Sequence, residues 1–132
     1  MRYIFDTNTF LQAKNDYYPF DVCPAFWDWL DLEHSRGTIC SIDAVKAEMR
    51  DRDARAWVAS HPTFFEPNDL TRLSEISNYV AGLTQYLPAE HQRFARGADP
   101  ILIAHALNTG GIVVTQEVTD TTGQKIKIPD VC

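Results

Sequence analysis

The sequence has little that would support a membrane-bound, secreted or disulfide-stabilised protein. No apolar run approaches the ~20 residues that a membrane-spanning helix needs. Asp6 interrupts the first apolar stretch, so that stretch is too short for the core of a signal peptide. The three cysteines, Cys23, Cys40 and Cys132, are odd in number and widely spaced, which excludes a disulfide framework and a C-x-x-C pair. We therefore expect a cytoplasmic protein without a membrane partner.

Basic residues and zinc-type ligands are also scarce. Twelve Lys and Arg stand against 18 Asp and Glu, and the formal net charge of −6 argues against passive binding to a phosphate backbone. An acidic site that recruits metal ions stays compatible with this charge, because a bound cation reverses the local sign. The four histidines show no metal-ligand spacing, and the two glycines at 110 and 111 match no phosphate-cradling motif.

The apolar residues that are present indicate an α/β protein with one domain, residues 1–132. Short, mainly β-branched runs alternate with stretches of helical periodicity, which predicts a short parallel sheet covered on both faces, a three-layer α/β/α sandwich. We expect strands at 2–5, 38–40 and 112–115, with a further candidate at 125–128. Helices are expected at 22–34, 42–51 (capped by Ser41), 54–60, 70–87, 89–96 and from 99 to about 107.

Four acidic residues fall where such a sheet binds its ligands, at the carboxyl ends of the strands. Asp6 ends the first strand, Glu48 lies on the helix after the second, Asp99 opens the apolar helix before the third, and Glu117 follows that third strand. Each also has a structural interpretation. Asp6 can cap a turn, Glu48 can be a solvated helix residue, Asp99 before Pro100 is a good N-cap, and Glu117 can be an ordinary loop acid.

Taken together, four stretches resemble the PIN-domain ribonucleases, which include the VapC-type toxins of bacterial toxin–antitoxin pairs. These stretches are the opening YIFDTN, the helix SIDAVKAEM, the helix GADPILIAHAL and the strand IVVTQE. More narrowly, the chain resembles an uncharacterised PIN-like bacterial family with YIFDTN-like openings and IPDVC-like endings. The resemblance covers nearly the whole chain, in order.

The resemblance implies a PIN-like fold and a metal-dependent endoribonuclease that hydrolyses RNA. It implies that the catalytic residues are Asp6, Glu48, Asp99 and Glu117. The chain departs from the family's T-x-D motif, because Glu117 stands where Asp is expected, and Asp130 competes for this fourth acidic position. Crowded carboxylates with oxygen-only ligands suit Mg²⁺ or Mn²⁺, and we expect Asp6 and Asp99 to be direct ligands.

Further roles follow from the same resemblance. Glu48 is expected to bind a second ion or align the attacking water, and Glu117 to act at longer range. Asn8 and Thr115 are expected to support the site, Asn8 by holding the Asp6 loop in shape. The resemblance also implies an RNA substrate, a cognate antitoxin as protein partner, and a homodimer.

Two alternatives stay open on the sequence. A phosphatase that forms an aspartyl-phosphate also places an Asp after a strand, but it needs a second Asp where this chain has Asn8. A catalytically weak or inactive PIN-like binding module could instead act through a protein partner, with the aromatic residues between 17 and 29 in the interface. The latter is the more serious alternative to a ribonuclease.

Overall fold

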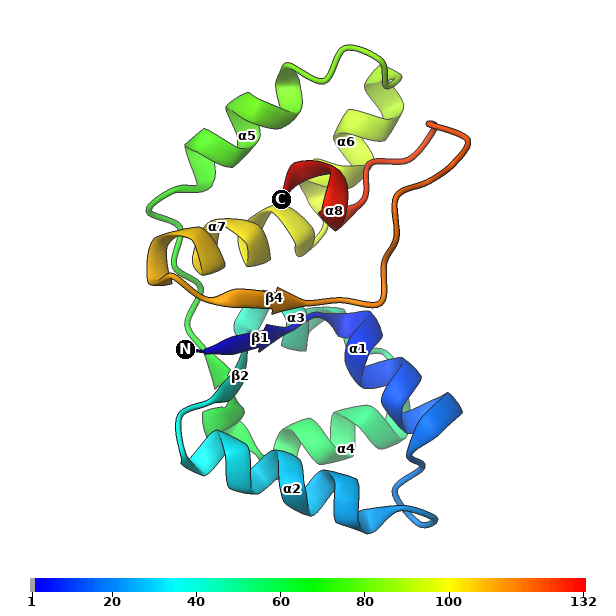
Figure 1. Ribbon diagram of the computed structural model, residues 1–132, viewed down its shortest axis with the longest axis vertical. Helices are drawn as coiled ribbons and strands as arrows, with labels where there is room; N and C mark the ends of the chain where they lie inside the picture. Colours follow the sequence, from blue (N-terminus) through cyan, green and yellow to red (C-terminus); the bar gives the residue numbers. More distant parts are fainter. Residues whose placement is uncertain (1) are drawn as a thin grey trace.

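The computed structural model describes residues 2–132 as a four-stranded sheet with layers of helices on both faces (Figure 1). The strands are β1 (Tyr3–Phe5), β2 (Ile39–Ile42), β3 (Phe65–Glu66) and β4 (Ile112–Val114), in the order β3-β2-β1-β4. All neighbouring strands are parallel, and Tyr3 pairs with Ile39 on one side and Ile112 on the other. The expected three-layer α/β/α architecture with a short parallel sheet is confirmed.

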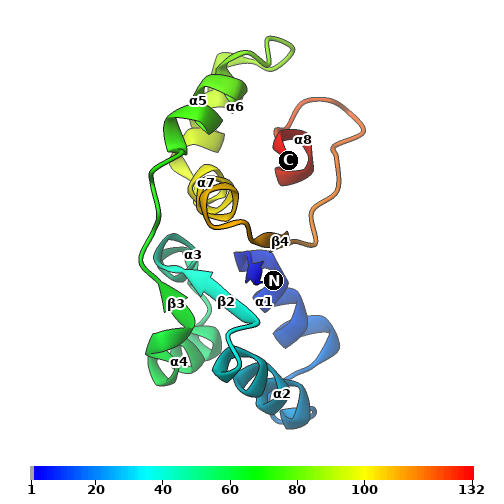
Figure 2. The same ribbon diagram turned by 60° about the vertical axis from the view of Figure 1, so that its left-hand side comes forward.

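The helices divide into two groups on opposite sides of the sheet (Figures 1 and 2). One group contains α1 (Thr7–Gln12), its π-helical continuation η1 (Ala13–Tyr17), α2 (Pro24–Ser35), α4 (Arg52–Ser60) and the short η2 (Pro62–Phe64). The other contains α5 (Leu73–Ala81), α6 (Pro88–Arg96), α7 (Asp99–Thr109) and α8 (Ile128–Val131). The remaining helix, α3 (Asp43–Glu48), follows β2 and contacts both α1 and α7, so it links the two groups.

Local sequence signals set several helix boundaries. Pro24 and Pro88 occupy the first turns of α2 and α6, where a missing backbone N–H costs nothing. The Asp51 side chain caps α4 by accepting from the N–H groups of Asp53 and Ala54. Helix α7 ends at Gly110, whose φ of 72° lies in the left-handed region that glycine adopts without strain.

The aromatic residues are concentrated on the α1, α2 and α4 side of the core. Phe10 of α1 packs edge-on against Phe5 and Phe64, with ring centroids 5.5 Å apart in each pair. Trp57 of α4 packs against Phe10 and Trp27. Aromatic pairs in these geometries add to the stability gained from burial, so this cluster fixes α1 firmly against the end of β1.

Three sequence expectations about elements are wrong. Ser41 does not cap a helix, because it belongs to β2 and its buried hydroxyl donates to the Phe5 carbonyl at 2.7 Å. The helix expected at 70–87 extends only over Leu73–Ala81. The strand candidate at 125–128 does not form; residue 126 is buried in a loop and α8 begins at residue 128. The sheet instead gains β3, a two-residue strand too short for any periodic signal.

The helices do not resemble membrane spans. Within residues 2–132, every helix is too short or too polar to cross a lipid bilayer.

Candidate active site

The candidate site lies at the carboxyl ends of β1 and β4, the two strands that Asp6 and Thr115 directly follow. The Asp6 N–H donates to the Val114 carbonyl at 3.2 Å, so the two strand ends stay adjacent beyond the sheet. A pocket of about 320 Å³ opens there, and all four predicted acids line it: Asp6, Glu48, Asp99 and Glu117. Its other lining residues are Thr7, Asn8, Arg50, Arg93, Phe94 and Gly97. The fold therefore brings together side chains that are up to 111 positions apart in sequence.

Asp6 is almost completely buried, with 3% of its surface exposed, and both of its carboxylate oxygens accept hydrogen bonds. Oδ1 accepts from the backbone N–H and the hydroxyl of Thr9, both at 2.8 Å, and thereby caps α1. Oδ2 accepts from the Thr115 hydroxyl at 2.6 Å. The structural interpretation of Asp6 as a cap is correct, and the same bonds hold its carboxylate at the pocket.

Glu48 is exposed at the end of α3 but is not an unconstrained surface residue. Oε2 accepts from the Thr7 hydroxyl at 2.9 Å, and Oε1 accepts from the backbone N–H of Ala98 at 2.8 Å. Glu48 thus joins the start of α1 to the start of α7 and directs its carboxylate into the space between them. These contacts distinguish it from the solvated helix residue that its sequence position also allowed.

Asp99 does not cap α7, contrary to the sequence expectation. The N-cap residue is Ala98, and Glu48 accepts its N–H from another part of the chain. Among the described residues, the Asp99 carboxylate has no hydrogen bond and no ion pair, although it is partly buried. Within residues 2–132 it is therefore the one predicted site acid whose carboxylate forms no bond with the surrounding protein.

The environment of Asp99 strongly disfavours its negative charge. Burial is the main cause, and repulsion from Glu117, Glu48 and Asp6 adds to it, with the opposing effect of Arg93 too weak to compensate. Together these effects raise the pKa of Asp99 to about 7. The shift therefore reflects burial first, with added repulsion from the three other carboxylates of the pocket.

Of the two residues expected to compete for the fourth acidic position, Glu117 lines the pocket and Asp130 does not. The Glu117 Oε2 accepts from the N–H of Ile128 at 2.9 Å, while its own N–H donates to the Thr115 hydroxyl at 3.0 Å. Asp130 does not line the pocket; its Oδ2 accepts from the Lys127 N–H at 2.8 Å at the start of α8. The extra methylene of Glu117 therefore does not prevent its carboxylate from approaching the site.

The supporting residues differ partly from those expected. Thr115 does bind Asp6, but Asn8 is exposed and, within residues 2–132, forms no hydrogen bond with the Asp6 loop. Thr9 holds that loop instead. An Asp followed by Thr three positions later, at the start of a helix, is the local signal that could have identified it.

Two arginines in the pocket were missed by the sequence analysis. Arg93 forms an ion pair with Glu90 and donates to the Ile126 carbonyl at 3.1 Å, so it braces the loop before α8. Its hydrogen bond is the main reason that the pKa of Glu90 falls to about 2. Arg50 has no ion-pair or hydrogen-bond partner for its side chain in the part of the chain that the structure describes. No local pattern places either residue beside the acids.

The oxygen donors of the pocket are of the kind that a hard divalent cation prefers, but they do not form a complete cage. No group of three His, Cys, Asp or Glu side chains in residues 2–132 is arranged to hold a metal ion. Mg²⁺ commonly uses only one or two protein carboxylates and completes its shell with water and substrate phosphate. Asp6 and Asp99 both line the pocket and are the carboxylates that could supply such ligands.

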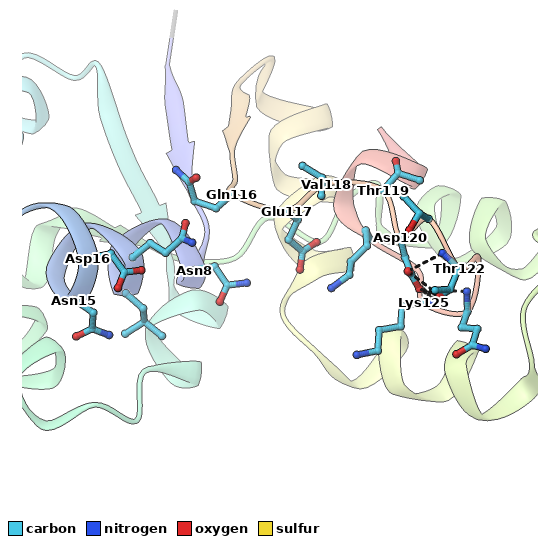
Figure 3. A pocket seen from close by; sticks show the side chains of 15 residues that line it. Asn8, Asn15, Asp16, Gln116, Glu117, Val118, Thr119, Asp120, Thr122 and Lys125 are labelled. Atoms are coloured by element: carbon cyan, nitrogen blue, oxygen red, sulfur yellow. Dashed lines mark hydrogen bonds between the residues drawn. The ribbon is translucent and has the colours of Figure 1, made fainter.

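A larger pocket adjoins this site and shares Asn8 and Glu117 with it. One wall comes from α1 and η1, including Asn15 and Asp16, and the other from the loop after β4 (Figure 3). In that loop the Asp120 carboxylate accepts hydrogen bonds from the hydroxyl and the N–H of Thr122. The acids thus adjoin a hollow between α1 and the 116–127 loop, and most residues that line this hollow are polar.

Comparisons with known proteins give one match and no functional description. Comparison with curated proteins found no match, and comparison with solved structures found none either. A family model with the description "Domain of unknown function (DUF4411)" matches residues 3–132. These findings do not connect the chain with the PIN-domain ribonucleases. Because the match covers nearly the whole sequence, the chain belongs to the DUF4411 family.

Proposed function

We propose that this chain is an endoribonuclease that depends on Mg²⁺ or Mn²⁺, and that it is the toxin of a bacterial toxin–antitoxin pair. The observation that carries the proposal is the convergence of four carboxylates on one pocket, where the pKa of Asp99 reaches about 7. Such a strongly perturbed acid in a cleft is typical of a functional site. The motif resemblance to PIN-domain ribonucleases supplies the reaction class and the toxin assignment.

Asp6 and Asp99 are the residues that would hold the cation. Asp6 is preorganised by Thr9 and Thr115, whereas the carboxylate of Asp99 has no hydrogen bond within residues 2–132 and gains most from a neutralising charge. The bound ion would lower the pKa of a coordinated water and offset the charge that develops on the phosphate. Before the ion binds, the same carboxylates repel an RNA phosphate, so activity requires the metal.

Glu48 and Glu117 act around this pair. Glu48 is fixed by Thr7 and Ala98 and still exposed, so it can align the attacking water and accept its proton. The water oxygen forms the new bond to phosphorus while the bond to the leaving ribose oxygen breaks. Glu117 is tied to Ile128, and its charge is the largest of the repulsions that act on Asp99.

A cleavage assay on labelled single-stranded RNA tests this function. Purified protein should cleave the RNA with Mg²⁺ or Mn²⁺, be inactive in EDTA, and show little activity with Ca²⁺, whose looser coordination positions water poorly. Asp6→Ala and Asp99→Asn should each lower the rate by roughly three orders of magnitude, and Glu117→Gln by much less. Asp28→Asn, which removes an exposed carboxylate that lines neither the acidic pocket nor the adjoining one, is the matched control.

Asp99→Asn is the most informative variant because Asp99 makes no bond that the fold requires. A folded Asp99→Asn protein that still cleaves RNA would contradict the proposed mechanism. Absence of metal-dependent cleavage in the wild-type protein would favour a binding module that acts through a partner.

The toxin assignment has its own test in bacterial growth. Expression of the wild-type chain alone should slow growth, and co-expression of the neighbouring gene's product should relieve it. Asp99→Asn, expressed to the same level, should be harmless. Normal growth with abundant folded wild-type protein would argue against a toxin.

A further inference from the structure

A second groove, of about 510 Å³, lies between α3 and α4 and is lined by three basic residues and no acidic one. The basic residues are Lys46, Arg50 and Arg55, and all three are exposed; the Lys46 ammonium also lies 3.8 Å from the Asp43 carboxylate. The rest of the lining is Ala47, Met49, Val58, Ala59 and Pro62, which are apolar. The chain has a net charge of −6, yet all charged side chains that line this groove are positive.

This concentration of charge results from how the fold separates neighbouring residues. Basic and acidic residues alternate from Arg50 to Asp53, and a further basic residue, Arg55, follows Ala54. The two acids turn toward Lys14 of η1, whose ammonium lies 3.0 Å from Asp51 and 4.0 Å from Asp53. The arginines have no carboxylate partner within the described residues, and two of them line the groove.

The groove adjoins the acidic pocket. Arg50 lines both of them. Helix α3 contributes to both as well, because Glu48 faces the acids while Lys46 and Ala47 face the groove. A strand whose phosphates follow the three basic side chains would therefore be led directly to the carboxylates.

We infer that this groove binds the phosphodiester backbone of single-stranded RNA and guides it into the acidic pocket. The inference rests on the proposed function for its substrate, but the groove and its charge are independent of catalysis. The positive groove supplies the electrostatic attraction that the acidic pocket and the net charge deny to RNA.

The effect on binding can be derived from counterion release. For single strands, each phosphate contact changes the slope of log K against log salt by about −0.7, so three contacts predict a slope of about −2. Lys46→Gln with Arg55→Gln should reduce that slope to about −0.7 and weaken binding roughly 25-fold at ~0.1 M salt. Neither residue lines the acidic pocket, so the chemical step should be unaffected.

The experiment measures fluorescence anisotropy of a labelled oligouridylate, about a dozen nucleotides long, in EDTA, where no cleavage occurs. The matched control is Arg52→Gln with Arg72→Gln, which changes the net charge equally but lies outside the groove. We expect weaker binding and a smaller salt slope only for the groove variant. With Mg²⁺, the groove variant should show a raised KM and an unchanged kcat.

The possible outcomes separate the groove from the catalytic proposal. Equal losses in both double variants would overturn the groove, because general charge would then explain binding. Absence of RNA binding by the wild-type protein would also overturn the inference, and an acidic protein segment would then be the better candidate ligand for the groove. Loss of binding confined to the groove variant, in a protein that never cleaves RNA, would support the groove and refute the ribonuclease.

Discussion

Removing the negative charge of Asp99 should stabilise the metal-free protein at neutral and alkaline pH. Asp99→Asn keeps the size of the side chain and removes a carboxylate that is partly buried, repelled by Glu117, Glu48 and Asp6, and free of hydrogen bonds among the described residues. The variant therefore loses a repulsive charge and no bond that holds α7 in place.

The magnitude follows from the pKa of Asp99, which rises from 3.8 to about 7 on folding. The folded protein holds its proton in a pH range where the unfolded chain has lost it, so the free energy of unfolding falls as pH rises from about 4 to about 7. Above pH 7 the cost is constant and amounts to at most about 4 kcal/mol, since solvent reaching this carboxyl screens its charge.

Urea unfolding in EDTA, from pH 4 to pH 8.5, measures this dependence for both proteins. The difference in unfolding free energy between Asp99→Asn and wild type should be small near pH 4 and grow to a plateau above pH 7. Added Mg²⁺ should stabilise the wild type more than the variant, because a ligand that binds only the folded state raises its stability. A pH-independent difference, or a variant less stable than wild type at pH 8, would refute the electrostatic account of this site.

Two further predictions concern the residues that support the site. Thr115→Val should destabilise the protein by about 1–3 kcal/mol in chemical denaturation, because the buried Asp6 oxygen loses its 2.6 Å hydrogen bond; an unchanged midpoint would show that this bond is unimportant. Arg93→Gln should raise the pKa of Glu90 from about 2 toward its ordinary value, since Arg93 is the main cause of the depression. NMR titration of the Glu90 carboxyl measures this pKa, and a value that stays low in the variant would contradict the prediction.

Several features of the fold could be read from local sequence. The short apolar runs that become β1 and β4, the prolines that open α2 and α6, and the glycine that ends α7 act through the backbone within a few residues. The positions of Asp6 and Glu117 after parallel strands predicted that they would lie at one edge, because parallel strands end on the same side of a sheet. These signals were sufficient for the architecture and for placing the four acids at one pocket, but not for its two arginines.

The state of each site residue was decided only by tertiary contacts. Glu48 reaches the Ala98 N–H from 50 positions away, and this contact replaces the cap that Asp99 was expected to provide. The charges of residues 50–55 do not by themselves predict a basic groove. The groove arises because Lys14 pairs with Asp51 and Asp53, while Arg50 and Arg55 line the other side. The sequence determines which groups are present and on which element they lie. The pKa of Asp99 and the charge of the groove depend on burial and on neighbouring charges, which exist only once separate segments pack together.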